Sequence, residues 1–213
     1  MSILVTGGSG FIGNSLVLSL LKTKEKIYVL DNDFRGSMKK FSKLNKASLK
    51  LVKGDIRNKK LVLKYVKKVH TVFHLAFING TRYFYDKPKL VLDVGIVGTL
   101  NVLEAVRNSR KTKTLIYASS SEVYNSPLKV PTDELVSMIV PDTFNSRYSY
   151  SSSKLIGEVM CYNYLKDLKK KLIIFRPHNI FGENMGYEHV IPELVKKIFI
   201  TSRGLKRKNI SLT

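Results

Sequence analysis

The stretch TGGSGFIG, residues 6–13, joins a short apolar run at residues 3–5 to a stretch with helical spacing at residues 11–21. Its glycines satisfy two spacings: GxGxxG through Gly8, Gly10 and Gly13, and GxxGxxG when Gly7 takes the first position. Glycine permits the tight turn by which a strand enters a helix directly. The stretch therefore predicts a strand, a glycine-rich turn and a helix at the start of a βαβ unit.

Apolar runs of strand length alternate with longer helical stretches along the rest of the chain. The predicted strands cover residues 27–30, 49–52, 72–76, 114–118 and 172–175, and the predicted helices cover 59–68, 90–106, 148–169 and 190–200. Strands that alternate with helices form right-handed βαβ units and a parallel sheet. The strands are apolar on both faces, as expected when helices cover both sides. The sequence predicts an α/β fold with a doubly wound parallel sheet.

The composition indicates a folded chain. The 213 residues are 44% hydrophobic, which excludes global disorder, and the single Cys161 excludes an internal disulfide and an all-cysteine metal cluster. No apolar run approaches the roughly 18 residues of a membrane helix. No signal peptide precedes the strand at Ile3. We expect a soluble, cytoplasmic protein and identify no metal ligands.

The net charge of +21 raises the question of a nucleic-acid partner. Lysine supplies 28 of the 37 positive residues and is scattered along the chain. Arginine, which suits bidentate contacts to phosphates and bases, supplies 9. Scattered lysines are typical of solvated helix faces. The charge therefore favours solubility and non-specific binding over a nucleic-acid partner.

An acidic residue follows the second predicted strand, where a dinucleotide site requires one. Asp31 lies 18 residues after Gly13; its carboxylate can bind the ribose hydroxyls of NAD and repels a 2′-phosphate. The glycine turn lets backbone N–H groups approach a pyrophosphate at the helix N-terminus. Arg35 leaves NADP as the alternative. Asp55, after the third strand, either reaches the adenine or caps the helix at residues 59–68.

A tyrosine and a lysine share one face of the predicted helix at residues 148–169. Tyr150 and Lys154 stand at i and i+4, and the ammonium, together with a nicotinamide cation, favours the phenolate and lowers the tyrosine pKa. Such a tyrosine can take a proton from a substrate hydroxyl while hydride leaves the same carbon for NAD. Serines 119–121 end the fifth strand, where one can hydrogen-bond the reacting oxygen. His74, in the fourth strand, is more typical of a packed histidine than of a catalytic one.

With these motifs the chain resembles the extended short-chain dehydrogenase/reductase family, in its nucleotide-sugar epimerase/dehydratase branch. The matching stretches occur in order at residues 6–13, 31–32, 54–56, 74–76, 98–105, 119–124, 150–154 and 176–182. The resemblance implies a Rossmann fold, tightly held NAD and a UDP-, dTDP- or GDP-sugar as substrate. It also implies a homodimer through the helices at 90–106 and 148–169, for which Cys161, Tyr162 and Leu165 offer apolar surface.

The resemblance also assigns roles to residues by their positions in the matching stretches. The catalytic residues are Ser120, Tyr150 and Lys154, and Glu122 is a candidate base. The cofactor-binding residues are Tyr150 and Lys154 again, with Gly7, Gly10, Phe11, Ile12, Gly13, Asp31, Asn32, Asp55, Ile56, Leu75, Ala76 and Pro177. The substrate-binding residues are Ser120, Ser121, Asn179 and His189.

Three departures from the family pattern affect these expectations. Gly95 replaces the asparagine of an Asn-x-x-Gly-Thr motif, Asn125 replaces a usual glycine, and the chain stops at Thr213 where family members continue. We expect an NAD-binding domain at residues 1–176 and an incomplete substrate-binding region at 177–213. Such a truncated chain is expected to bind NAD but to turn over sugar nucleotides poorly.

The reactions of this branch begin alike, with Tyr150 taking the proton of the sugar 4-hydroxyl while NAD takes the C4 hydride. A 4-epimerase returns the hydride to the other face of the ketosugar. A 4,6-dehydratase needs a further base, for which Glu122 is the candidate, and decarboxylases of the branch share the Ser-Glu pair. We favour a 4-epimerase, with dehydratase or decarboxylase as the alternative. A non-catalytic NAD-binding fragment, or a basic module for nucleic acid or protein, is the alternative from another class.

Overall fold

The computed structural model describes residues 1–44, 47–127, 129–182, 185 and 190–202. The chain divides into two compact units, Met1–His178 and Asn179–Thr213. The first unit holds the sheet, and the second holds helix α7, Val190–Ser202. No helix of the described residues is long and apolar enough to cross a bilayer.

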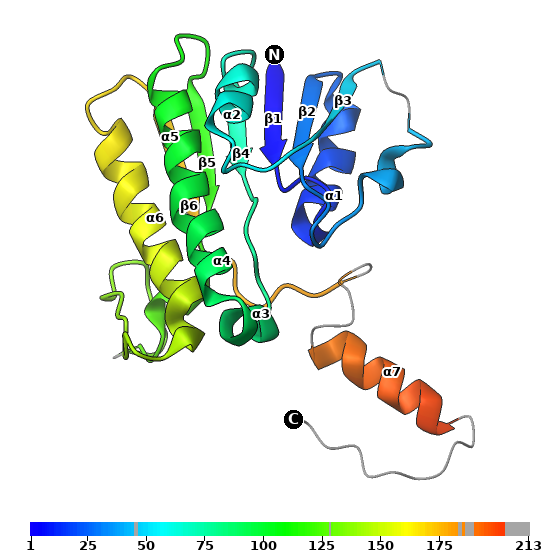
Figure 1. Cartoon of the computed structure of the whole chain (residues 1–213), viewed down its shortest axis with the longest axis vertical. Helices are drawn as coiled ribbons and strands as arrows, with labels where there is room; N and C mark the ends of the chain where they lie inside the picture. The colour runs from blue at the N-terminus through cyan, green and yellow to red at the C-terminus, as the bar shows by residue number, and fades with distance from the viewer. Residues whose placement is uncertain (45–46, 128, 183–184, 186–189, 203–213) are drawn as a thin grey trace. The chain divides into compact units, whose positions relative to one another are not determined.

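Six parallel strands form one sheet in the order β3-β2-β1-β4-β5-β6 (Figure 1). The strands are β1 (Ser2–Thr6), β2 (Lys26–Asp31), β3 (Leu49–Lys53), β4 (Thr71–His74), β5 (Thr114–Ala118) and β6 (Lys171–Phe175). This order confirms the predicted doubly wound sheet of the Rossmann type. The strand order reverses between β1 and β4, and sheets of this kind bind ligands outside the carboxyl ends of the strands at that point.

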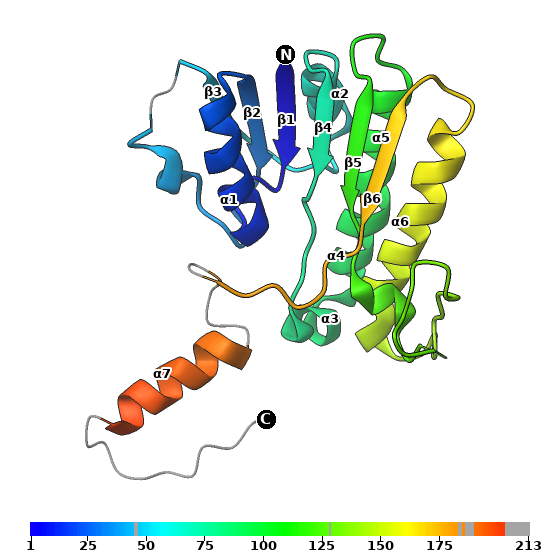
Figure 2. The same ribbon diagram turned by 180° about the vertical axis from the view of Figure 1, so that it is seen from behind.

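Helices cover both faces of the sheet, as the front and back views show (Figures 1 and 2). One face carries α1 (Phe11–Leu20), and the other carries α2 (Lys59–Val66), α5 (Thr99–Arg107) and α6 (Ser149–Leu165). Alternate strand residues enter two cores because successive side chains point to opposite faces. Val5 and Val29 pack with Val17 of α1, whereas Leu4 and Leu30 join the larger core beneath the other helices.

The structure divides the predicted helix at residues 90–106 into three helical segments. A short α4 (Pro88–Leu92) leads into a π-helical turn (Asp93–Gly98), and α5 follows. Glycines let this turn pack closely, because a Cβ on Gly98 would lie 2.4 Å from Cδ1 of Ile56. A π turn inserts a residue into the helical period, so the 3.6-residue spacing does not predict it. The sequence also did not predict α3 (Thr81–Asp86).

The predicted helix at residues 148–169 is shorter at both ends. A 3-10 turn, Ser146–Tyr148, precedes α6, which ends at Leu165. Beyond it Lys170 donates hydrogen bonds to the carbonyls of Ser109 and Thr112, at 2.6 and 2.7 Å.

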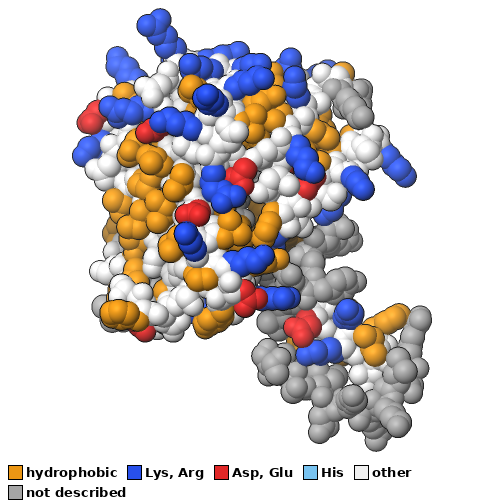
Figure 3. Space-filling model, in the orientation of Figure 1, with side chains coloured by type: hydrophobic (Ala, Val, Ile, Leu, Met, Phe, Trp, Pro, Cys, Tyr) orange, Lys and Arg blue, Asp and Glu red, His pale blue; other side chains and the backbone are white. Residues whose placement is uncertain are grey.

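Lysine and arginine side chains are spread over the face drawn in Figure 3, with apolar groups between them.

Candidate functional site

The glycine-rich turn lies at the carboxyl end of β1. Gly7 has a φ of +70°, and a Cβ there would lie 2.6 Å from Cα of Ala76; a Cβ on Gly13 would lie 2.2 Å from the carbonyl oxygen of Gly7. The packing of the turn itself therefore requires these two glycines. Gly10 differs, because its φ is −70° and the nearest atom to an added Cβ is the Gly7 oxygen, at 3.3 Å. A Cβ at Gly10 would therefore make one tight contact with the backbone, which is less severe than the overlap at Gly7 or Gly13.

The N-terminus of α1 has no side-chain cap. Gly10 is the N-cap residue, no side chain accepts a hydrogen bond from the first turn, and that turn contains no acidic residue. The first amides of a helix have no partner within it, and the helix dipole places partial positive charge on them. The predicted cofactor residues Phe11, Ile12 and Gly13 supply these amides. This end of α1 is therefore suited to an anion such as a pyrophosphate.

Asp31, the last residue of β2, is fixed beside the turn. Its Oδ2 accepts a hydrogen bond from the backbone N–H of Ser9 at 2.9 Å, and its Oδ1 accepts one from that of Asp33 at 2.8 Å. Each carboxylate oxygen has a further lone pair for a ligand hydroxyl. Arg35, the residue that would favour a 2′-phosphate, donates to the backbone carbonyl of Asn79.

Asp55 and Asn32 lie together after β3 and β2. Asn32 donates to Oδ2 of Asp55 at 3.2 Å, and Arg57 donates to both carboxylate oxygens, at 3.0 and 2.8 Å. The hydrogen bond from Arg57 is the main cause of a lowered pKa of Asp55, against burial. The alternative that Asp55 caps α2 is wrong, because the side chain of Asn58 accepts the hydrogen bond from the N–H of Leu61.

The end of β4 is held against β1 by a threonine. Thr6 accepts the N–H of Leu75 on its carbonyl, and its hydroxyl lies 3.3 Å from the N–H of Ala76 and 2.8 Å from Nδ1 of His74. Nε2 of His74 lies 3.1 Å from the Thr99 hydroxyl. Burial, followed by the charge of Lys154, lowers the pKa of His74 to about 3. His74 is thus a packed histidine, as predicted.

Tyr150 lies at the N-terminal end of α6, in an aromatic environment. Its ring stacks on Phe84 with the centroids 5.0 Å apart and meets Phe77 edge-on at 5.3 Å. The side chain of Ser120 lies within range to act on its hydroxyl. Burial raises the pKa of Tyr150 to about 12, and Ser120 opposes that rise. Within the chain itself desolvation therefore decides the pKa of Tyr150. The lowering expected from the Lys154 ammonium together with a nicotinamide cation stays a prediction.

The ammonium of Lys154 is buried and points to two groups. Nζ donates to the carbonyl oxygen of Ala118 at 2.5 Å, and it lies 3.7 Å from the centroid of the Phe77 ring. The Tyr150 ring is farther away, at 5.7 Å. Burial lowers the pKa of Lys154 to about 7. The i, i+4 spacing therefore brings the two side chains to one face of α6, while β5 and Phe77 decide where the ammonium lies.

The segment after β5 carries the serine and glutamate of the predicted site. Ser120 accepts the backbone N–H of Glu122 at 3.2 Å, and the N–H of Ser121 donates to the carbonyl of Pro177 at 3.0 Å. Glu122 accepts a hydrogen bond from Arg147 at 2.9 Å. The sequence did not single out Arg147, since 25 residues separate it from Glu122 and no local spacing relates them.

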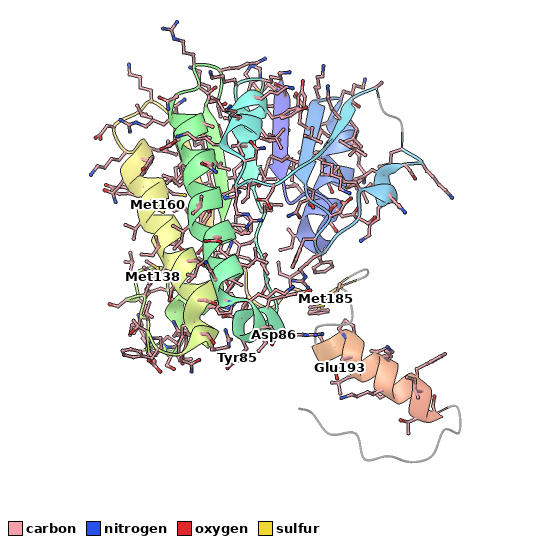
Figure 4. The ribbon with its side chains drawn as sticks, viewed as in Figure 1. Tyr85, Asp86, Met138, Met160, Met185 and Glu193 are labelled. Carbon is pink, nitrogen blue, oxygen red and sulfur yellow. The ribbon has the colours of Figure 1, made fainter. Side chains whose placement is uncertain are left out.

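Arg176 joins the site to the long connection at residues 125–147. Its guanidinium donates to both carboxylate oxygens of Glu158 on α6, at 2.9 and 2.6 Å, and to the hydroxyl of Tyr124 at 2.7 Å. It also reaches the carbonyl of Glu134 at 3.1 Å and the sulfur of Met138 at 3.5 Å. Met138 is one of the side chains labelled in Figure 4. These partners come from three parts of the sequence, namely the segment after β5, the connection and α6, so Arg176 fixes the connection against α6.

The structure brings Ser120, Tyr150 and Lys154 together, and it brings Asp31 to the glycine turn. Asn179 belongs to the second unit and is exposed. His189 lies outside the described residues. Phe77 and Phe84 were missed, although Phe77 directly follows the predicted fourth strand, at the edge where ligands bind.

The chain matches a family model described as the NAD dependent epimerase/dehydratase family over residues 3–203. It is 31% identical to a UDP-N-acetyl-alpha-D-glucosaminuronate decarboxylase from Bacillus cytotoxicus, over 91% of this chain and 60% of the relative. It is 32% identical to a putative UDP-glucose 4-epimerase from Methanocaldococcus jannaschii, over 85% of this chain and 56% of the relative.

The fold is similar to that of solved structures. A UDP-glucose 4-epimerase from Thermus thermophilus, in complex with NAD, matches with a TM-score of 0.77 and 25% identity, over 92% of this chain and 61% of the other. The chain thus spans about 60% of the length of these proteins. The matches cover the sheet, the glycine turn and the helix that carries Tyr150 and Lys154.

Proposed function

Because the chain belongs to the NAD dependent epimerase/dehydratase family, we propose that it binds NAD and oxidises a nucleotide sugar transiently at C4, as a 4-epimerase. The observation that carries the proposal is that Ser120, directly after the carboxyl end of β5, acts on the hydroxyl of Tyr150, with Lys154 one helical turn further along α6. Together they supply a proton acceptor, a hydroxyl that can orient the substrate oxygen, and an ammonium.

Two features of the carboxyl edge fit NAD. The uncapped amides of α1 and the absence of a side chain at Gly10 suit a pyrophosphate, which needs close approach of the backbone. The Asp31 carboxylate, fixed by two backbone N–H groups, suits the adenine ribose hydroxyls. Asn32, Asp55 and Ile56 follow β2 and β3, where they would border the adenine.

The proposed chemistry divides between the cofactor and three side chains. Bound NAD would supply a hydride acceptor for sugar C4 and a positive charge that favours the Tyr150 phenolate. Tyr150 takes the proton of the sugar 4-hydroxyl and later returns it, while Ser120 donates a hydrogen bond to the same oxygen. Lys154 holds the nicotinamide ribose and stabilises the phenolate.

The substrate we propose is a UDP-, dTDP- or GDP-sugar. The relatives named above act on UDP-sugars by their names, which supports this class. Ser120 and Ser121 would contact the sugar from the first unit. We propose that residues 177–213 form part of the substrate-binding region, with Asn179 and His189 as contacts.

NAD is expected to bind more tightly than NADP. Asp31 lies where a 2′-phosphate would meet its carboxylate, and Arg35 is engaged with the carbonyl of Asn79. Isothermal titration calorimetry with both cofactors measures the difference. Tighter NADP binding would contradict the role of Asp31, and no binding of either cofactor would overturn the proposed function.

Glu122→Gln is expected to separate an epimerase from a dehydratase. An epimerase should lose little activity, since its reaction needs no base beyond Tyr150, and glutamine can still accept the hydrogen bond from Arg147. A dehydratase should form the 4-keto sugar but fail to eliminate water. NMR of the products distinguishes the two results. Glu104→Gln is the matched control, because its carboxylate pairs with Lys59 at the surface.

The proposal includes a homodimer through α4–α5 and α6. The exposed side chains Val97, Ile156, Val159 and Tyr162 support it, and Figure 3 shows apolar side chains gathered over these helices. Two of the residues predicted to supply the interface do not face outward, because Cys161 and Leu165 are buried in the core of the chain itself. The dimer stays a prediction.

A further inference from the structure

We propose that Phe77 is a positioning residue that keeps the buried ammonium of Lys154 protonated and fixed against the Ala118 carbonyl. The contact and its effect on Lys154 do not depend on the proposed function. A cation over the face of an aromatic ring is attracted by the ring quadrupole, and more strongly when water is excluded.

The contact distances single out Phe77 among the rings around Lys154. Nζ lies 3.7 Å from the Phe77 centroid, against 5.2 Å for Tyr117 and 5.7 Å for Tyr150. The carbonyl of Ala118 accepts one N–H of the ammonium, at 2.5 Å. The ammonium of Lys154 is therefore held between the Ala118 carbonyl and the face of the Phe77 ring.

The nearest carboxylate is engaged elsewhere. Five titratable groups surround or act on Lys154. Tyr150, Glu158 and Cys161 lie on α6, Tyr117 lies on β5 and His74 lies on β4. Among them Glu158 is the residue whose charge would stabilise a cation, but Arg176 donates two hydrogen bonds to it. Burial raises the pKa values of Tyr117, Tyr150 and Cys161 and lowers that of His74, so these groups are neutral near pH 7.

Gly95 makes room for the Phe77 ring. A Cβ on Gly95 would lie 2.5 Å from Cζ of Phe77 and 2.8 Å from Cβ of Ser153 on α6. Any side chain at position 95 would therefore displace the ring or the helix. An asparagine, the residue of the family pattern, does not fit beside Phe77 in this packing. We interpret Gly95 and Phe77 as a matched pair, in which the ring occupies space that a side chain at position 95 would need.

Phe77→Leu tests the contact, because leucine keeps an apolar side chain but has no ring face. In protein labelled with [ε-¹³C]lysine, the resonance of Lys154 should titrate near pH 7, apart from those of the other 27 lysines. Lys154→Met assigns it. Phe77→Leu should lower its pKa by about one unit, which corresponds to about 1.4 kcal/mol of lost ammonium stabilisation. Phe77→Tyr, which retains the ring, should restore it.

Phe41→Leu is the matched control. Phe41 is fully buried in the α1-side core, so its loss disturbs packing without touching Lys154. An unchanged Lys154 titration in folded Phe77→Leu, or an equal shift in Phe41→Leu, would overturn the proposal. If Phe77→Leu does not fold, Phe77→Met takes its place. The titration needs no cofactor, so a failure of NAD binding in calorimetry is a separate result that concerns the proposed function alone.

Discussion

Tyr150→Phe is expected to lower turnover of a nucleotide sugar by about 10²–10⁴-fold, the usual worth of a general acid–base group. The change removes the oxygen that would take the substrate proton. It keeps the ring that stacks on Phe84 and meets Phe77. The melting temperature and the NAD affinity should therefore stay near the wild-type values, while kcat falls. Steady-state kinetics, calorimetry and thermal melts measure the three quantities on this chain or on a longer form that turns over.

Tyr148→Phe is the matched control for this experiment. Tyr148 lies two residues earlier, in the 3-10 turn that precedes α6, and should keep near-full activity when its hydroxyl is removed. Near-full activity in Tyr150→Phe would show that the mechanism is wrong. A large loss in Tyr148→Phe alone would assign the proton transfer to that residue instead.

Gly10→Ala is expected to weaken NAD binding at least about tenfold, or about 1.4 kcal/mol, with a smaller loss of stability than Gly13→Ala. The backbone at Gly10 has a φ that alanine adopts freely, and its added Cβ would come no closer than 3.3 Å to the protein. The same Cβ would occupy the space through which a pyrophosphate approaches the α1 amides. Calorimetry with NAD and a thermal melt on the same sample separate affinity from stability.

Gly13→Ala provides the contrast within the same turn. Its Cβ would lie 2.2 Å from the Gly7 carbonyl oxygen, so the turn must move. We expect loss of stability together with loss of NAD binding. Unchanged NAD affinity in a well-folded Gly10→Ala would refute the assignment of this turn to the pyrophosphate.

Much of the fold could be predicted from local sequence. The six strands lie where apolar runs of strand length occur, and the 114–118 run coincides with β5. The glycine turn and the acid after β2 were recognisable because each depends on neighbours a few residues away. Helix α3 and the π form of the turn at residues 93–98 were not predicted, because they depend on packing against Tyr150 and Ile56 rather than on a period in the sequence.

The candidate site divides in the same way. Its residue types and their helical spacing follow from the sequence, so Ser120, Tyr150 and Lys154 could be named in advance. Their electrostatics could not, because the pKa of Tyr150 depends on how much water the surrounding rings exclude. The sequence predicted that the Lys154 ammonium and a nicotinamide cation together lower the tyrosine pKa. The sequence could not predict that the chain's own packing raises this pKa to about 12, mainly through burial.

The sequence by itself determined the order of strands and helices, the glycine turn and the chemistry available at the carboxyl edge. Only the tertiary structure decided that the Lys154 ammonium lies on Phe77, that Arg147 binds Glu122, and that Arg176 binds Glu158. The physical reason is the separation along the sequence between the residues that interact. Strand and helix patterns arise between residues up to four positions apart, where the backbone fixes the geometry. The partners in these three contacts are 77, 25 and 18 residues apart, so packing of the whole sheet and its helices determines whether they meet.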